Sequence, residues 1–502
     1  MFLAYFFAAT ISSCEKLNDG SSDNDGRPER VKIPDNEIWY TTTNSEKLDL
    51  TYNTSKFIEN PIISNTYKDG KGVITFQEAL TCIPEQGFVN RNRLKTIILP
   101  DCVRSLECET FAGCNYLLNI QLSENLESIG QEALCSSSRM DSLFIPAKVS
   151  YIANDALSNT NNLKYLVVDK QNKFFDSREN CNALIETASN TLLRGSSHST
   201  IPSTVTSLGD YAFSMADFKS LDIPENISSI GVSAFEYCLL LEEIRLPENL
   251  TVISGLAFNS CEKLKEIQIP EKVTKIGGGA FGNCRSINKI TIPETIIEIG
   301  QGAFYFCTEL TEAVLPEKLT TIPDALFKDC WNLSRVNIPQ NITSIGKEAF
   351  YCCNKLSDIT LPESVTEIKS GAFYKTDIRT ITIPSKVREI SDNSFRSCNS
   401  LENIFLPEGL KSIQNDAISS EAMTEIVIPS TIENFGVAAL AGSNLTSIYI
   451  KATTPPQTVL WLFLRTETIE NKKIYVPSQS VETYKTSEFW KTYESMIKGY
   501  DF

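Results

Sequence analysis

Apolar residues recur along most of the chain with a period of 22 or 23 residues. Residues 264–284 show one complete period, with apolar side chains at Leu264, Ile267, Ile269, Val273, Ile276, Ala280, Phe281 and Cys284. Ile267 and Ile269 alternate with polar neighbours, as in a strand that has one buried face. Pro270 cannot donate a ladder hydrogen bond and so ends the strand. Each period therefore predicts one short strand followed by turns.

Two columns of residues repeat in phase. Prolines follow the predicted strands at Pro224, Pro247, Pro270, Pro293, Pro316, Pro339, Pro362, Pro384, Pro407 and Pro429, and Pro100 and Pro146 continue this series backward. The second column contains Phe88, Phe111, Leu134, Leu157, Phe213, Phe235, Phe258, Phe281, Phe304, Phe327, Phe350, Phe373, Phe395, Ile418 and Leu440. This column marks fifteen units.

A single unit is too small to fold by itself, because its few apolar side chains cannot offset the entropy of ordering 22 or 23 residues. Stacked units share their apolar faces and their strand hydrogen bonds. The predicted fold is therefore a β-rich solenoid. About fifteen units stack as a parallel ladder and are joined by short irregular or 3-10 turns.

The repeat resembles the BspA-like leucine-rich repeat of Bacteroidetes surface lipoproteins. The pattern Leu-x-x-Ile-x-Ile-Pro-x-x-Val-x-x-Ile-Gly-x-x-Ala-Phe-x-x-Cys carries this resemblance over about residues 37–502. Segments 36–40 and 72–76 resemble the start of that family's repeat region, and segments 451–456 and 474–477 resemble its C-terminal cap. The resemblance implies an N-terminal cap at 37–72, leucine-rich repeats at 73–450 and a C-terminal cap at 451–502.

One unit is longer than the others, with extra residues over about 169–200. Residues 183–187 and 191–195 flank Ala188-Ser189-Asn190, which predicts a β-hairpin that protrudes from the solenoid. Residues 176–183 resemble an insertion known in the family. Relatives often carry a second cysteine where Ser196 stands here, which argues against a disulfide at Cys181.

The N-terminus is predicted to be a targeting segment. Residues 1–13 are apolar and end in small residues before Cys14. Residues 11–14 resemble a bacterial lipobox, which implies a signal peptide at 1–13, lipidation of Cys14 and anchoring in the outer membrane facing the cell exterior. An ordinary signal peptide or a short buried strand are the alternatives. No Lys or Arg precedes Cys14, so the translation start is expected upstream of Met1.

The segment after Cys14 is polar and acidic. Residues 14–36 are predicted to be a disordered tether, and residues 21–25 resemble a surface-export signal. The whole chain has a formal net charge of −16. This charge argues against nucleic acid and anionic lipid as partners, which leaves the lipid anchor as the expected contact with a membrane. No later stretch is long and apolar enough to span a bilayer.

The sequence contains 15 cysteines and a single histidine, His198. Eight units place a cysteine three residues after the phenylalanine column: Cys114, Cys238, Cys261, Cys284, Cys307, Cys330, Cys353 and Cys398. Disulfides are the alternative in an exported protein, but a slot in phase with core positions favours buried free thiols that fill the turn. There is no Cys-x-x-Cys pair and one histidine cannot complete the usual zinc sets, so no metal and no cofactor are expected.

No motif for catalysis is present, so the chain is not expected to be an enzyme. His198 lies in a polar segment, which predicts a surface turn and not a catalytic base. Gly277-Gly278-Gly279 lacks the Lys-Ser/Thr of a phosphate loop. Carboxylate pairs are common in so acidic a chain, and none of them is singled out as a glycosidase site.

Two outward columns of polar residues form the predicted binding face. One contains Glu243, Glu266, Lys289, Glu312, Arg335, Asp358, Thr380, Asn403 and Glu425; the other contains Arg245, Gln268, Thr291, Val314, Asn337, Thr360, Thr382, Phe405, Val427 and Tyr449. The predicted ligand-binding residues are Phe405, Val427, Tyr449, Arg335, Asn337 and Thr360, because exposed apolar clusters often mark contact sites. The alternative is that these columns only stabilise neighbouring strands.

Three functional hypotheses follow. The resemblance implies a cell-surface adhesion or recognition protein that binds host or bacterial surface macromolecules, such as a host-matrix protein, through a repeat face. The chain is expected to be monomeric. The alternative is a glycan-capturing surface lipoprotein linked to nutrient uptake, for which exposed aromatics along the face are expected. An enzyme with a site in the insertion or the N-terminal segment is a third, weaker possibility.

Overall fold

The computed structural model describes residues 30–160, 162–441, 444–458, 461–463 and 471–502. The predicted signal peptide, Cys14 and the first part of the tether lie outside these residues. The chain is a leucine-rich β-solenoid of about 18 turns with a repeat of about 23 residues. The number exceeds the fifteen predicted units because the terminal segments add strands to the stack. Two compact units divide the chain, unit 1 at Met1–Leu240 and unit 2 at Leu241–Phe502.

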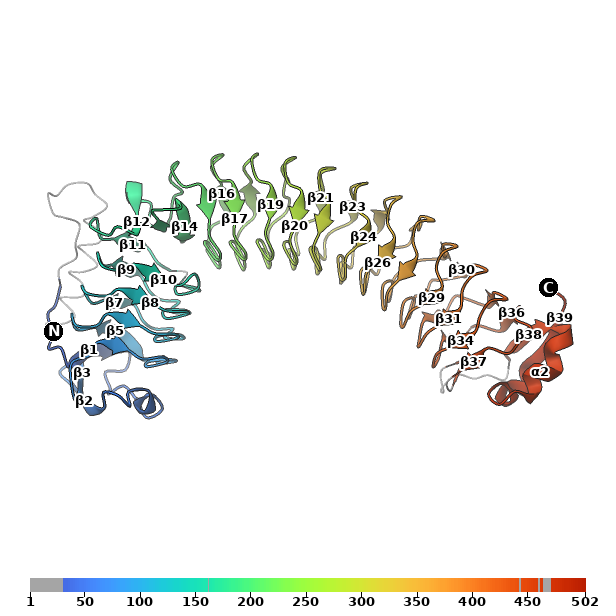
Figure 1. Ribbon diagram of the computed structural model, residues 1–502, viewed down its shortest axis with the longest axis horizontal. Coiled ribbons are helices and arrows are strands. Elements are labelled where there is room, and N and C mark those ends of the chain that lie inside the picture. The colour runs from blue at the N-terminus through green and yellow to red at the C-terminus, as the bar shows by residue number, and fades with distance from the viewer. Residues whose placement is uncertain (1–29, 161, 442–443, 459–460, 464–470) are drawn as a thin grey trace. The chain divides into compact units, whose positions relative to one another are not determined.

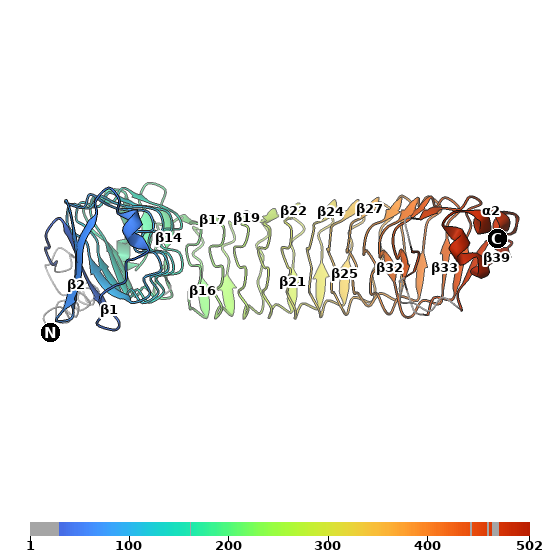
Figure 2. The same cartoon turned by 90° about the horizontal axis from the view of Figure 1, so that it is seen from below.

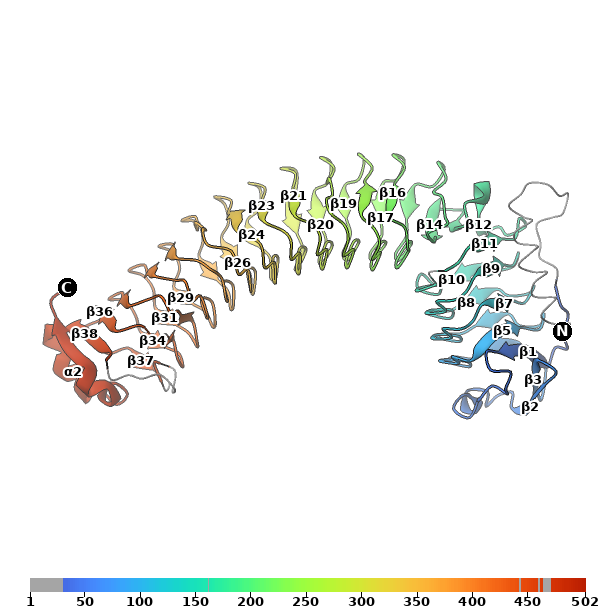
Figure 3. The same cartoon turned by 180° about the vertical axis from the view of Figure 1, so that it is seen from behind.

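Two parallel ladders run through unit 1 (Figures 1 and 3). The first contains β5 (Leu94–Ile98), β7 (Asn119–Gln121), β9 (Ser142–Ile145) and β11 (Tyr165–Val168). The second contains β4 (Cys82–Ile83), β6 (Ser105–Leu106), β8 (Ser128–Ile129) and β10 (Tyr151–Ile152). Cys82 lies opposite Ser105, and Ser105 lies opposite Ser128, so each rung is one sequence period from the next.

An antiparallel segment covers the start of the first ladder. It contains β1 (Glu37–Thr42), β2 (Ile62–Lys68) and β3 (Lys71–Phe76), and β1 pairs antiparallel with both β3 and β5. The cap therefore extends to Phe76, beyond the predicted boundary at 72. The last residues of the predicted tether contact the ladder, since the Arg30 guanidinium donates to the carbonyl of Leu122 at 2.9 Å.

The insertion forms a hairpin that is part of a ladder. Strands β13 (Leu184–Glu186) and β14 (Thr191–Arg194) pair antiparallel, as predicted. The predicted protrusion is wrong, because β14 pairs in parallel with β15 (Ser207–Leu208), which pairs with β17 (Ser229–Ile230). Leu184 and Leu192 are buried, and a protruding hairpin would expose them. Strands β12 (Phe175–Asp176) and β16 (Ser220–Asp222) complete this region.

The side chain of Arg194 replaces a missing turn beside the Phe213 turn. In regular turns, the backbone N–H groups of Phe258 and Ser260 donate to the carbonyls of Ala280 and Gly282 in the next turn. Beside the Phe213 turn, the N–H of Gly195 donates to the carbonyl of Ala212 at 2.7 Å. The buried Arg194 guanidinium donates to the carbonyls of Tyr211 at 2.8 Å and Ser214 at 3.3 Å. One side chain therefore supplies donors that a turn of backbone supplies elsewhere.

Unit 2 is the more regular stack, and Figure 2 shows its two ladders on opposite sides. The first ladder contains β18 (Glu243–Arg245), β21 (Lys289–Thr291), β23 (Glu312–Val314), β25 (Arg335–Asn337), β28 (Thr380–Thr382), β30 (Asn403–Phe405), β33 (Glu425–Ile428) and β36 (Ser447–Ile450). The second contains β19 (Val252–Ile253), β20 (Lys275–Ile276), β22 (Glu298–Ile299), β24 (Thr321–Ile322), β26 (Ser344–Ile345), β27 (Glu367–Ile368), β29 (Glu389–Ile390), β31 (Ser412–Ile413), β34 (Asn434–Phe435) and β37 (Gln457–Thr458). A short pair at the turns contains β32 (Ile418–Ser419) and β35 (Leu440–Ala441).

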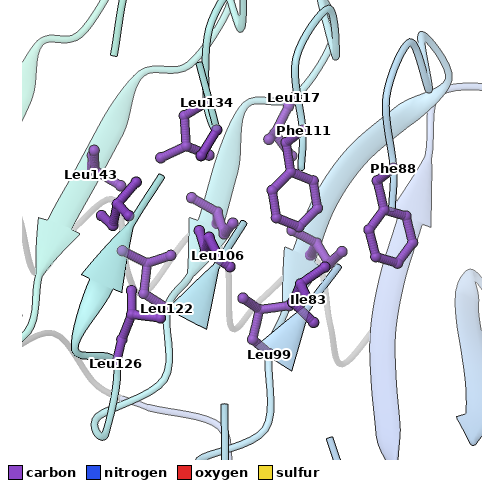
Figure 4. Close-up of a cluster of buried hydrophobic side chains, with 14 of the residues drawn as sticks. Ile83, Phe88, Leu99, Leu106, Phe111, Leu117, Leu122, Leu126, Leu134 and Leu143 are labelled. Atoms are coloured by element: carbon purple, nitrogen blue, oxygen red, sulfur yellow. The ribbon is translucent and has the colours of Figure 1, made fainter. Parts of the chain in front are cut away.

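The phenylalanine column forms a stack of rings inside each unit. Phe281 and Phe304 lie with ring centroids 5.5 Å apart and an interplanar angle of 2°. Phe88 and Phe111 stack in the same way in unit 1, beside Ile83 and Leu106 (Figure 4). These rings are completely buried, so the core is a continuous row and each turn completes the burial of its neighbours.

The predicted cysteine column consists of buried free thiols. Its members also make a hydrogen bond that the pattern does not predict. The thiol of Cys307 donates to the carbonyl of Phe281, 26 residues earlier, at 3.2 Å, and Cys330 donates to Phe304 at 3.1 Å. Burial raises the pKa of Cys114 to about 12 and that of Cys398 to about 11. The column therefore links successive turns through neutral thiols.

The C-terminal segment adds rungs and covers the last turn. Strands β38 (Lys473–Pro477) and β39 (Ile497–Tyr500) continue the first ladder in parallel. Elements η3 (Ser478–Ser480), α2 (Val481–Thr486) and η4 (Trp490–Met496) connect them. The buried Trp490 packs edge-on against Phe435 and donates to the carbonyl of Pro456 at 2.8 Å. Among the described residues, no helix is long and apolar enough to cross a membrane.

Candidate functional site

The strand register of unit 2 places the two predicted outward columns as expected. Lys289, Glu312 and Arg335 lie opposite one another on successive strands. Thr291 and Val314 lie opposite one another in the second column, where Asn337 follows. These residues are exposed because each strand has one buried central residue between two outward ones. The face is therefore a continuous outer surface of the first ladder.

The six predicted ligand-binding residues form two separate groups. The first group contains Arg335, Asn337 and Thr360, and all three are exposed. The Arg335 side chain is 77% exposed and lies 3.9 Å from the Glu312 carboxylate. The Asn337 amide accepts from the backbone N–H of Leu315 at 2.6 Å and donates to its carbonyl at 3.1 Å. Asn337 therefore ties two strands together, which is the stabilising alternative considered from the sequence.

The second group lies at the C-terminal end of the face. Phe405 on β30 is 57% exposed and Val427 on β33 is 44% exposed. Val427 lies directly opposite Tyr449 on β36. Tyr449 in turn lies opposite Tyr475 on β38, and the two rings stack with centroids 4.7 Å apart. The residues predicted at this end thus lie on neighbouring strands, with Phe405 and Val427 exposed and Tyr449 half-buried.

The structure adds three aromatic residues to this group. The ring of Tyr500 packs edge-on against Tyr449 at 5.2 Å and against Tyr475 at 5.8 Å. Phe502 lies 5.0 Å from Tyr500. We call Val427, Tyr449, Tyr475, Tyr500 and Phe502 the aromatic patch, with Phe405 beside it.

The sequence analysis missed Tyr475, Tyr500 and Phe502 because it treated the C-terminal segment only as a cap. A signal was nevertheless present for one of them. Ile474-Tyr475-Val476-Pro477 repeats the strand pattern Ile-x-Ile-Pro that marks every earlier rung. Tyr475 could therefore have been placed in the outward column beside Tyr449. Nothing comparable in the pattern identifies Tyr500 or Phe502.

The environment of the aromatic patch favours neutral phenols. Desolvation raises the pKa of Tyr449, and the nearby Glu425 carboxylate raises it further, as do Tyr475 and Tyr500. Tyr449 and Tyr475 cover one another's ring faces, so they present ring edges and hydroxyl groups outward. Such a surface can bury apolar area and donate hydrogen bonds at the same time.

The other residues considered from the sequence occupy separate positions. His198 is exposed, and its Nδ1 lies 3.3 Å from the hydroxyl of its neighbour Ser197. Gly277 packs against the backbone of Ser254 and Gly255, where a Cβ would collide, so it serves turn packing. Within the described part of the chain, no group of three or more His, Cys, Asp or Glu residues is arranged to hold a metal ion.

Comparison with known proteins identifies the repeat. The family model described as "BspA type Leucine rich repeat region" matches six times, over residues 33–184, 195–293, 229–347, 276–402, 320–446 and 367–493. No match is found among curated proteins.

Several solved structures of bacterial leucine-rich repeat proteins are similar. One from Bacteroides ovatus is 19% identical, with 87% of this chain and 90% of that chain covered and a TM-score of 0.42. A leucine-rich cell surface protein from Faecalibacterium prausnitzii is 20% identical over 68% and 86%, with a TM-score of 0.38. A Treponema pallidum leucine-rich repeat protein is 30% identical over 31% and 72%, with a TM-score of 0.28.

Proposed function

Because the chain belongs to the BspA-type leucine-rich repeat family, we propose that it is a cell-surface recognition protein that binds an extracellular protein. The family is typically one of non-catalytic binding proteins. The proposed contact surface is the outer face of the first ladder of unit 2, at the aromatic patch. The single observation that carries this proposal is the group formed by the half-buried Tyr449 and Tyr475, with the exposed Tyr500 and Val427 beside them.

The composition of the patch suits a protein partner. Tyrosine is enriched among the residues that dominate protein–protein binding energies, and apolar side chains around it exclude water. Phe405, Val427 and Phe502 supply exposed apolar surface. A flat sugar ring would stack on an open aromatic face, but Tyr449 and Tyr475 use their faces on each other. A protein surface, possessing both apolar side chains and carbonyl acceptors, complements ring edges and hydroxyls better.

The proposed location is the outer membrane, with the chain anchored by a lipid on Cys14 and facing the exterior. Support comes from the lipobox-like residues 11–14 and from the similarity to a leucine-rich cell surface protein. Metabolic labelling with a fatty-acid analogue tests it. Label is expected on the wild-type chain and not on Cys14→Ser, and equal labelling of both would contradict the anchor.

The binding proposal is tested with immobilised host-matrix proteins such as fibronectin and fibrinogen. Tyr449→Ala and Phe405→Ala are each expected to raise the dissociation constant about thirtyfold, the loss typical of an interface hot spot. Val314→Ala is the matched control, because Val314 is 51% exposed in the same outward column of unit 2. Failure of the wild-type chain to bind any matrix protein, or equal effects of Val314→Ala and Tyr449→Ala, would contradict the proposal.

A further inference from the structure

The insertion of unit 1 interrupts the first ladder at β11. This strand is the last in its sheet, whose order is β11-β9-β7-β5-β1-β3-β2. The N–H groups of Tyr165 and Asp169 donate to carbonyls on the β9 side of the strand. The N–H groups of Leu166 and Val168 therefore face the opposite edge. There the Asn182 side chain accepts from the N–H of Leu166 at 2.5 Å, and the Ser177 hydroxyl accepts from Val168 at 3.0 Å. Side chains of the insertion therefore occupy the donors of the strand edge.

A cavity of about 360 Å³ lies between β11 and the insertion. This volume is at the lower end of the range for small-molecule sites, roughly 300–1,000 Å³. The wall on the strand side includes the half-buried side chains of Tyr165 and Val167. The opposite wall includes Asp176, Glu179 and Asn180. The cavity thus combines an aromatic residue and aliphatic strand residues with several carboxylates and amides.

A network of hydrogen bonds holds the insertion in place. The Arg178 guanidinium forms a two-pronged contact with Asp176, at 2.7 Å from Nε to Oδ1 and 2.6 Å from Nη2 to Oδ2. Its Nη1 also donates to Asn190 at 2.8 Å and to Thr204 at 3.3 Å. Burial alone would raise the pKa of Asp176, but the hydrogen bonds from Arg178 outweigh it and hold the pKa below its ordinary value. The cavity wall is therefore formed without a ligand, which reduces the entropy lost on binding.

We propose that this cavity binds a small, uncharged saccharide. The charged groups around it are three carboxylates and two cations, and the Asp176–Arg178 pair is neutral in itself, so no strong field selects an ion. Carboxylate and amide oxygens, such as those of Glu179 and Asn180, accept hydrogen bonds from sugar hydroxyls, and the Asn180 amide also donates. The Tyr165 ring provides apolar surface for the C–H side of a sugar ring.

The strand edge argues against an extended peptide as the occupant. A peptide that adds a strand needs the edge donors of β11. Those of Leu166 and Val168 are already paired with Asn182 and Ser177. The site also lies outside the aromatic patch, so this proposal does not depend on the proposed protein partner.

The test is ligand-observed NMR of the full chain with glucose, galactose, mannose and N-acetylglucosamine, and with a short extended peptide as a competing probe. At least one sugar is expected to bind in the millimolar range. Tyr165→Ala is expected to weaken that binding roughly tenfold, the effect of losing one good contact. Tyr151→Ala is the matched control, because Tyr151 is 58% exposed on β10, outside the cavity, and should leave the affinity unchanged.

Lys170→Ala provides a second variant at an exposed lining residue. If Lys170→Ala loses less sugar affinity than Tyr165→Ala and its thermal transition is unchanged, the result supports the site. Absence of binding by all four sugars, binding of the peptide instead, or equal affinities of Tyr165→Ala and wild type would overturn the proposal. Tyr449→Ala should leave sugar binding intact, so the two proposals fail separately.

Discussion

The regular turns of unit 2, residues 264–405, and the interrupted turns of unit 1, residues 165–214, satisfy the same backbone groups in different ways. In the regular stretch the N–H of Phe281 donates to the carbonyl of Ala303 and that of Phe304 to Leu326, one turn further on. In the interrupted stretch the Arg194 side chain donates to a carbonyl of the next turn, and the Asn182 and Ser177 side chains accept from N–H groups of β11. Backbone pairing in the regular stretch requires no particular side chains, whereas the interrupted stretch depends on a few specific residues.

The two stretches also differ in what they leave for binding. The regular rungs present their outer columns, so the proposed recognition there depends on outward side chains such as the exposed Phe405. The interruption leaves a cavity, because a side chain fills less space than a strand. Local loss of the repeat therefore accompanies a concave surface beside β11.

The largest expected effect is alkaline destabilisation of the regular stretch. Burial raises the pKa of Cys284, Cys330, Cys353 and Cys398 above the ordinary value of 9.0, whereas the interrupted stretch contains only Cys181. A raised folded-state pKa contributes stability that is complete below pH 9 and is lost as pH rises toward the folded pKa, about 11 for Cys398. Between these two pKa values, each thiol lowers the free energy of unfolding by up to about 1.4 kcal/mol per pH unit.

Thermal unfolding between pH 7.5 and 10.5, combined with iodoacetamide labelling and peptide mapping, measures this effect. The transition temperature should fall steeply above pH 9, with the column thiols labelled before Cys181. Cys330→Ala should make the slope shallower. A pH-independent transition, or earlier labelling of Cys181, would show that the thiols do not distinguish the two stretches.

Arg194→Ala should be the most damaging single substitution in the interrupted stretch. It leaves the carbonyl of Ser214 without the donor that Arg194 supplies, at about 1–3 kcal/mol, removes one of two donors to the carbonyl of Tyr211, and opens a cavity. We expect unfolding of unit 1 to become easier by about 4–5 kcal/mol. Chemical denaturation followed by limited proteolysis within residues 190–215 measures it. Arg335→Ala, at an exposed arginine of the regular stretch, is the control and should change stability by less than about 0.5 kcal/mol.

The sequence predicts most of the regular stretch and little of the interrupted one. The spacing of Pro270 and Phe281 identifies each rung, since one inward pattern repeats with every turn. The role of Arg194 depends on the absence of a neighbouring turn, and the periodic pattern contains no such information. The hairpin was predicted from local turn residues, but its incorporation into a ladder arises from the tertiary pairing of β14 with β15.

The same limit applies to the candidate sites. Phe405, Val427 and Tyr449 were predicted because they occupy outward positions of recognisable strands. The cavity beside β11 was not predicted, because Tyr165 and Asp176 meet there only through the fold of the insertion.

Phe304→Ala should cause the next largest loss of stability, in the regular stretch. Phe304 is completely buried and stacks with Phe281 at 5.5 Å and with Phe327 at 5.8 Å. We expect a loss of about 3–4 kcal/mol from the cavity that remains. Phe304→Leu should cost only about 1 kcal/mol, since leucine fills most of the space. Leu134 occupies the equivalent position in unit 1. Denaturant titration compares the two variants, and equal losses would mean that ring stacking, and not volume, determines this column.

The smallest expected effect concerns the charges on the outer face of the regular stretch. Lys289, Glu312, Arg335 and Asp358 alternate in sign on successive rungs. Because the Arg335 side chain is 77% exposed, water and salt screen its attraction to Glu312. A double-mutant cycle with Glu312→Gln and Arg335→Gln should give a coupling of about 0.2–1 kcal/mol that decreases in 1 M salt. A coupling as large as the effect of Arg194→Ala would mean that side chains stabilise regular rungs as strongly as interrupted ones, and the contrast between the two stretches would disappear.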